Sequence, residues 1–166
     1  GGVTTMKLVE KMDAGAIYLQ EPLPLAPDET TGSLQKKLTP IGSRLLAETL
    51  GRLKEGSLIP REQDGSQASL APMLKKEDGL IDWRRAAVEI ERRVRGFDPW
   101  PGSFTYLNGR LLKVHRTMII TENRGEPGEI IRADSGGFWV ATATTAVSLE
   151  EVQLENKKKL PGTEFI

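Results

Sequence analysis

The pentapeptide Asp98-Pro99-Trp100-Pro101-Gly102 divides this sequence into two parts with different hydrophobic periods. Before it, apolar residues recur at steps of three and four, which is the period of an α-helix. After it, they occur in short alternating runs bounded by turn residues, which is typical of β-strands. The two prolines fix φ on either side of Trp100, so we expect a rigid turn whose indole ring fills the end of a small barrel.

The part after this turn predicts about five short antiparallel strands. Asn108-Gly109 is the strongest hairpin signal in the chain, and it joins a strand at 104–107 to one at 111–120. Three further strands are predicted at 128–133, 138–143 and 147–154. This spacing predicts a small, five-stranded, OB-like antiparallel β-barrel, a fold that often binds single-stranded or looped nucleic acid.

A helix is predicted before the barrel. Asp82 is expected to cap its N-terminus and Gly96 to end it. The residues of its buried stripe are separated by steps of four and three: Trp83, Ala87, Ile90, Val94 and Phe97.

The first 56 residues predict an α/β remnant, too short to be a complete doubly wound domain. Strands are expected at 3–6 and 17–25, and a helix over 34–53. Pro40 lies inside the helical pattern and predicts a kink or two abutting helices, and Gly56 is expected just after the helix ends. Residues 57–75 are polar and predict a linker. The chain opens without Met inside a predicted strand, which indicates a piece of something longer.

Asp13 is the candidate functional residue of this first part. It lies between the two predicted strands, and Gly15 permits a tight turn directly after it. A carboxylate on a short turn is fixed by the strands and exposed by the loop, which suits it for chemistry. The alternative is an Asx-turn, in which the side chain bonds its own backbone.

Composition excludes several kinds of site. The chain has no cysteine, which excludes disulfides and thiolate metal sites, and its one histidine, His115, has no partner spacing for a metal. His115 is therefore predicted to be a partly exposed strand residue rather than a base or ligand. Lys+Arg and Asp+Glu both total 23, so net charge indicates neither nucleic acid nor membrane as a partner. No apolar run approaches the roughly 18 residues of a membrane helix, and no signal peptide is visible.

Taken together, the chain resembles the C-terminal half to two-thirds of the methionyl-tRNA formyltransferase family, in order and over essentially all 166 residues. The segments on which the resemblance rests are Gly2-Val3-Thr4-Thr5-Met6, Met12-Asp13-Ala14-Gly15, Thr31-Gly32-Ser33-Leu34, Ile81-Asp82-Trp83, Phe97-Asp98-Pro99-Trp100-Pro101, Gly128 with Ile130, and Lys157-Lys158.

The resemblance implies a two-domain enzyme of the cytoplasm, monomeric, without a metal or membrane contact. A Rossmann-like domain, of which 1–56 is the end, binds 10-formyltetrahydrofolate; after the linker, an OB-like domain at 76–166 holds the initiator methionyl-tRNA. The formyl group passes to the α-amino group of the methionine. Asp13 matches the Asp of the family's catalytic Asn, His and Asp, while the Asn-x-His segment is absent. The chain alone is therefore expected to be inactive.

The resemblance also implies lysine contacts to the tRNA, and the matching candidates are Lys75, Lys76, Lys113, Lys157 and Lys158. Phosphate neutralisation needs no particular spacing, so the alternative for each is an ordinary solvated lysine.

Three alternatives to the tRNA substrate stay open: a sugar-amine formyltransferase, a formyltetrahydrofolate hydrolase domain, and a stand-alone OB-type RNA-binding module. The chain continues into no second enzyme domain after its lysines, which favours tRNA. We also expect 76–166 to fold alone and 1–56 to be poorly stable in isolation, since a sheet edge and an apolar helix face would be uncovered.

Overall fold

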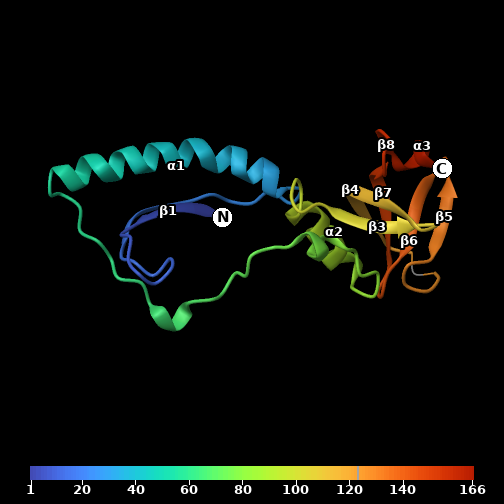
Figure 1. The fold of residues 1–166 in the computed structure, drawn as a ribbon, viewed down its shortest axis with the longest axis horizontal. Coiled ribbons are helices and arrows are strands. Elements are labelled where there is room, and N and C mark those ends of the chain that lie inside the picture. The colour runs from blue at the N-terminus through green and yellow to red at the C-terminus, as the bar shows by residue number, and fades with distance from the viewer. Residues whose placement is uncertain (123) are drawn as a thin grey trace. The chain divides into compact units, whose positions relative to one another are not determined.

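A computed structural model describes residues 1–122 and 124–166 of the chain. The described residues form two compact units, Gly1–Pro72 and Met73–Ile166. The first contains a two-stranded sheet and one long helix, and the second contains a six-stranded sheet (Figure 1).

The sheet of the first unit is an antiparallel pair, β1 (Gly2–Met6) and β2 (Ile17–Pro22). The prediction that the second strand reaches residue 25 is wrong. Pro22 and Pro24 have no N–H group to donate across a sheet, so regular pairing ends at Pro22. Thr5 joins β1 to the helix above it, because its hydroxyl lies 2.8 Å from that of Thr49.

That helix, α1 (Thr31–Lys54), is continuous, so the alternative of two abutting helices is wrong. Pro40 lies on its exposed side, where the carbonyl that lacks its helical donor can bond water. The N-terminus is closed by a capping box, in which Ser33 N donates to Thr30 Oγ1 at 3.2 Å and Thr30 N donates to Ser33 Oγ at 3.0 Å. Gly56 follows the helix with φ of 68°, which confirms its predicted place.

The stretch after α1 is fixed against β2 by backbone hydrogen bonds. Ile17 N donates to Arg61 O and Arg61 N donates to Ile17 O, both at 2.8 Å. A short 3-10 helix, η1 (Gly65–Gln67), follows, with Asp64 as its cap. Arg61, in the stretch that the sequence predicts to be linker, therefore pairs with the first residue of β2.

The sheet of the second unit is antiparallel, with the strand order β3-β4-β7-β6-β5, and β8 pairs with β7. Its strands and the helices beside them are β3 (Ser103–Leu107), β4 (Arg110–Ile120), β5 (Ile130–Asp134), β6 (Gly137–Ala141), β7 (Ala146–Leu154), β8 (Lys159–Pro161), η2 (Lys76–Gly79), α2 (Ala87–Gly96) and α3 (Gly162–Phe165). No pairing among the described residues joins β3 to β5, so a closed barrel is not confirmed. β8 lies in the lysine-rich tail, for which no strand is predicted from the sequence.

The core of the second unit lies between α2 and the inner face of the sheet. Ala87, Ile90 and Val94 are at most 2% exposed, which confirms these three positions of the predicted stripe, whereas Trp83 and Phe97 lie outside α2. The buried strand residues packed with them are Leu112, Val114, Phe138, Val140, Val147, Leu149 and Val152. Phe165 of α3 stacks on Phe138 with the ring centroids 5.8 Å apart.

The prediction that Asp82 caps this helix is wrong. Asp82 instead accepts from Arg84 N at 3.1 Å, in the turn that precedes α2. The N-cap is Ala86, which has no side-chain acceptor, and the free N–H of Ala87 donates to Thr144 Oγ1 at 3.2 Å. A hydroxyl from the β6–β7 turn thus satisfies the helix terminus. Gly96 ends the helix as predicted.

The prediction that Trp100 fills a barrel end is also wrong, because Trp100 is 56% exposed. Its turn is closed by Gly102 N donating to Phe97 O at 2.9 Å. The indole that packs against the core is that of Trp83, whose Nε1 donates to Thr105 Oγ1 at 3.1 Å. Among the described residues, no helix has the length and apolarity that a membrane crossing requires.

Candidate active-site turn and nucleic-acid interface

The turn that presents Asp13 is closed by its backbone. Lys7 N donates to Ala16 O at 2.9 Å, and Asp13 itself has φ of 53°, a conformation that aspartate tolerates better than most residues. Gly15 is required by a close approach, because a Cβ built on it would lie 1.7 Å from Lys7 O. The tight turn that the sequence predicts at Gly15 therefore has a steric cause, because no side chain fits between this residue and Lys7.

Gln63, from a distant part of the chain, holds this turn by hydrogen bonds. Its Nε2 donates to the backbone carbonyls of Asp13 at 2.8 Å and Gly15 at 2.7 Å. Sequence reasoning missed Gln63, because a glutamine in a polar stretch about fifty residues away gives no local signal.

An open cleft of about 620 Å³ lies between the Asp13 turn and residues 61–70. Two aspartates, Asp13 and Asp64, line the cleft. The Asp64 carboxylate accepts hydrogen bonds from Ser66 Oγ at 2.6 Å and from Ser66 N at 2.9 Å. These bonds hold the pKa of the Asp64 carboxyl below its usual range. The Asp13 side chain is exposed and its carboxylate makes no hydrogen bond or ion pair with the described residues. Asp13 is thus the aspartate that this cleft leaves available to a ligand.

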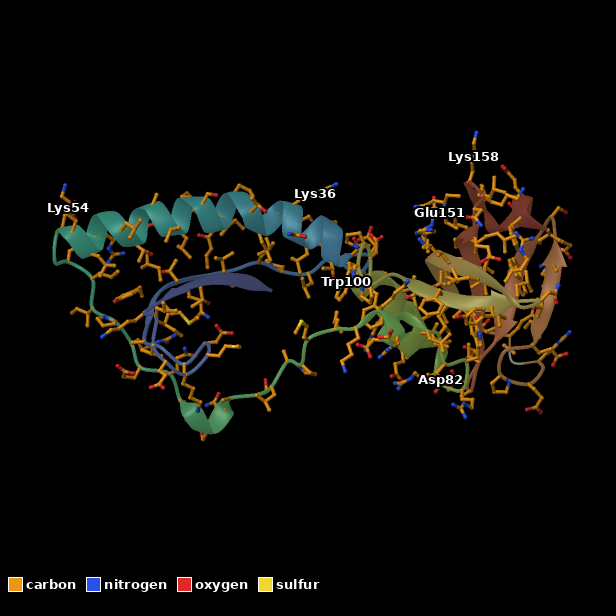
Figure 2. All side chains as sticks on the ribbon, viewed as in Figure 1. Lys36, Lys54, Asp82, Trp100, Glu151 and Lys158 are labelled. Carbon is orange, nitrogen blue, oxygen red and sulfur yellow. The ribbon has the colours of Figure 1, made fainter. Side chains whose placement is uncertain are left out.

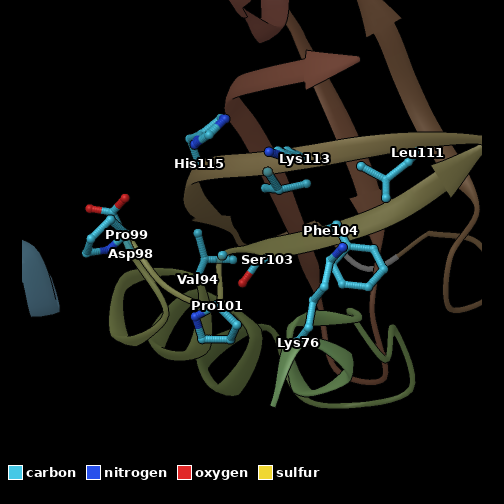
Figure 3. A pocket seen from close by; sticks show the side chains of 12 residues that line it. Lys76, Val94, Asp98, Pro99, Pro101, Ser103, Phe104, Leu111, Lys113 and His115 are labelled. Carbon is cyan, nitrogen blue, oxygen red and sulfur yellow. The ribbon is translucent and has the colours of Figure 1, made fainter. Parts of the chain in front are cut away.

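In the second unit, two of the five candidate lysines meet at one pocket. Lys76, at the start of η2, and Lys113, on β4, both line a pocket of about 200 Å³ beside β3 (Figure 3). Neither ammonium has an ion-pair partner in the described part of the chain. Lys113 is the cross-strand partner of Phe104, so the two side chains leave the sheet on the same face.

The other three lysines do not line this pocket. Lys75 precedes η2, and its backbone N donates to Asp78 Oδ2 at 2.6 Å. Lys157 and Lys158 lie in the exposed turn between β7 and β8, where Lys158 points outward (Figure 2). The five candidate lysines therefore lie at the pocket, just before η2 and in the β7–β8 turn.

His115 also lines the pocket, although the sequence analysis gave it no role. It is partly exposed on β4, as predicted, and its Nε2 lies 3.3 Å from Gln153 Oε1. Burial, followed by the charge of Lys159, lowers the pKa of the ring, so the neutral imidazole is favoured. The register of β4 against β7 shifts between Val114 and Arg116, and such bulges redirect side chains.

The chain belongs to the formyltransferases: residues 73–166 match the family described as "Formyl transferase, C-terminal domain". Over 165 residues it is 42% identical to the methionyl-tRNA formyltransferase of Geobacter sulfurreducens and 46% identical to that of Geotalea daltonii. Each alignment covers 99% of this chain, but 52% and 53% of those proteins. The resemblance inferred from the motifs is confirmed, and the chain spans about half the length of the curated relatives it matches.

Solved structures show the same fold at low identity. HypX from Aquifex aeolicus in complex with tetrahydrofolic acid matches with a TM-score of 0.68 and 22% identity, over 99% of this chain and 29% of that one. A methionyl-tRNA formyltransferase from Clostridium thermocellum matches with a TM-score of 0.54 and 15% identity, over 92% and 55%. An N-formyltransferase from Helicobacter canadensis, in complex with folinic acid and dTDP-3-aminofucose, matches with a TM-score of 0.67 and 15% identity, over 96% and 55%.

Proposed function

We propose that this chain is the C-terminal part of an enzyme that transfers a formyl group from 10-formyltetrahydrofolate to the α-amino group of methionyl initiator tRNA in the cytoplasm. The observation that supports this most strongly is the identity of 42–46% to methionyl-tRNA formyltransferases over 99% of the chain. Likeness to the sugar N-formyltransferases rests on fold at about 15% identity, so the alternative sugar-amine substrate has less support.

In this proposal Asp13 belongs to the catalytic machinery. The amine nitrogen attacks the formyl carbon, an oxyanion develops, and the nitrogen loses a proton as the bond to the folate nitrogen breaks and that nitrogen is protonated. The Asp13 carboxylate orients the His of the family's trio and stabilises its charged form. Support comes from the turn, which Gln63 and the Lys7–Ala16 hydrogen bond fix while the carboxylate stays unengaged. The cleft beside it lies within the roughly 300–1,000 Å³ of ordinary ligand sites.

We propose that the second unit has an OB-like fold whose barrel is not closed, and that it binds the tRNA. Lys75, Lys76 and Lys113 would contact RNA near the pocket, and Lys157 and Lys158 would contact phosphates from the β7–β8 turn. Each phosphate contact by lysine contributes a salt-dependent share of the affinity. The 166 residues alone are proposed to be inactive, since the Asn-x-His segment of the trio has no counterpart in them.

The test uses the full-length protein with Asp13→Asn, assayed for formyl transfer to methionyl-tRNA and, separately, for tRNA binding. Turnover should fall by at least roughly 100-fold, the scale of general acid–base catalysis, while tRNA affinity stays the same. Glu10→Gln is the matched control, because Glu10 is an exposed carboxylate of the same loop. Its turnover should equal that of the wild type.

Two outcomes would contradict the proposal. Undiminished turnover in Asp13→Asn would leave Asp13 as a turn-forming residue. The second is a wild-type enzyme that does not formylate tRNA but formylates a sugar amine or hydrolyses the folate. The family assignment would then stand, and the proposed tRNA substrate would be wrong.

A further inference from the structure

The pocket beside β3, β4 and the turn after α2 has the size of a site for one small chemical unit. Its volume of about 200 Å³ is below the roughly 300–1,000 Å³ of sites for whole cofactors and drug-sized ligands. A folate or a base pair would not fit inside it, whereas a single base would, with its ribose and phosphate at the rim.

The walls of the pocket are apolar and include one aromatic ring. Phe104 and Leu111 contribute from the two strands, and Pro101 contributes from the turn after α2 (Figure 3). The Phe104 ring is held by an edge-to-face contact with Tyr106, with ring centroids 6.1 Å apart and an interplanar angle of 88°. A fixed aromatic face beside a proline suits the stacking of a planar base.

The charged groups of the pocket are of both signs. Lys76 and Lys113 supply two ammonium groups without ion-pair partners among the described residues, and Asp98 supplies a carboxylate that is likewise without a hydrogen bond there. A bare phosphate would satisfy the lysines but face repulsion from Asp98. A ligand that carries a phosphate together with hydroxyl donors would satisfy all three groups.

We propose that this pocket binds one unpaired ribonucleotide, with its base against Phe104 and Pro101, its phosphate at Lys76 and Lys113, and a ribose hydroxyl at Asp98. The inference rests on the proposed function for the source of the nucleotide, an RNA partner. It adds that these two lysines act on a single unstacked nucleotide rather than along a duplex. Bases inside an A-form helix do not offer their faces, so the nucleotide must come from a single-stranded segment.

His115 gives a direct measurement of occupancy, because it is the only histidine of the chain and lines the pocket. The 166-residue chain would be titrated at constant pH with adenosine 5′-monophosphate, adenosine or inorganic phosphate, and the ring resonance of His115 followed by NMR. We expect a saturable shift with the nucleotide, at lower concentration than with either of its parts. Equal responses to the nucleotide and to inorganic phosphate would reduce the pocket to an anion site and overturn the proposal.

Two substitutions test whether the Phe104 ring and the Lys113 ammonium contribute to nucleotide affinity. Phe104→Leu keeps an apolar residue in the strand and should weaken nucleotide binding roughly tenfold, since base–aromatic stacking has about this effect. Lys113→Gln should weaken the nucleotide and leave adenosine unchanged. The controls are Met118→Leu, an exposed β4 residue that does not line the pocket, and Lys54→Gln in the first unit. Loss of binding in the controls to the same extent would contradict the assignment.

A final comparison identifies the source of the nucleotide. A hairpin RNA with a single-stranded tail should shift the His115 resonance, and the same hairpin with a blunt end should not. Binding of free nucleotide with no response to either RNA would overturn the RNA assignment. If the full-length protein fails to formylate tRNA while the tailed hairpin still shifts His115, the proposed function fails and the pocket inference stands.

Discussion

Replacing Gly15 by alanine tests the structural account of the Asp13 turn. The new Cβ would lie 1.7 Å from Lys7 O and 2.8 Å from Lys7 C, whereas ordinary contacts begin at 3.4 Å. The backbone of the turn must therefore move, which breaks the 2.9 Å hydrogen bond from Lys7 N to Ala16 O. Overpacking of this kind costs about 1–3 kcal/mol and a lost hydrogen bond about 1 kcal/mol, so we expect a loss of about 2–4 kcal/mol.

The chain allows this loss to be assigned to the first unit. Trp83, Trp100 and Trp139 all lie in the second unit, so tryptophan fluorescence follows that unit alone, while circular dichroism also follows α1. In urea, the circular dichroism midpoint of the first unit should fall by on the order of 1–2 M, with the fluorescence midpoint unchanged.

Gly51→Ala is the matched control, because Gly51 lies in α1 with nothing within 4 Å of its Cβ position. It should stabilise the first unit by about 0.5–1 kcal/mol. If Gly15→Ala unfolds at the wild-type midpoint, the close approach to Lys7 does not constrain the turn, and the reasoning is refuted.

Three further outcomes are expected. Ile90→Ala should destabilise the second unit by about 2–5 kcal/mol by opening a cavity, against less than about 0.5 kcal/mol for the exposed Val88→Ala, both followed by tryptophan fluorescence in urea. Thr144→Val should cost about 1 kcal/mol in the same assay, because Ala87 N loses its acceptor; an unchanged midpoint would mean that water replaces the hydroxyl. Lys37, 2.6 Å away, and then Ser33 lower the pKa of Glu29 from 4.5, so its stabilising contribution is present above about pH 4.5 and lost as the pH falls through the lowered value. The difference in stability between wild type and Glu29→Gln should therefore shrink on acidification, and a difference that stays constant in urea titrations down to low pH would contradict this linkage.

The features that the sequence predicted correctly depend on neighbouring residues. Asn108 and Gly109 have φ of 50° and 78°, the positive values that a two-residue hairpin requires, and the turn formed where the dipeptide stands. The stripe through Ile90 and Val94 could be predicted because residues three and four positions apart lie on the same face of a helix.

The features that it missed depend on contacts between distant residues. Gln63 contacts the Asp13 turn from the stretch after α1, and Thr144 closes α2 from the β6–β7 turn. The rigid turn between two prolines predicted a core position for the Trp100 ring, although it is Trp83 that packs there. β7 pairs with three neighbouring strands, and a pocket lies beside β4. Both features depend on how the strands are arranged in the folded sheet, which cannot be predicted from local sequence patterns.

The hydrogen bond from Ala87 to Thr144 has a consequence for how the chain is made, because the two residues are 57 positions apart. At about 5–20 residues per second, the ribosome synthesises α2 roughly 3–11 s before it adds that threonine. During this interval the apolar stripe of the nascent helix has only β3 and β4 to cover it, since β6 and β7 are still to come. The first unit, whose contacts lie within Gly1–Pro72, has all its residues before α2 begins. Translation therefore leaves the stripe of α2 partly uncovered for several seconds, during which chaperones can bind it or aggregation can begin.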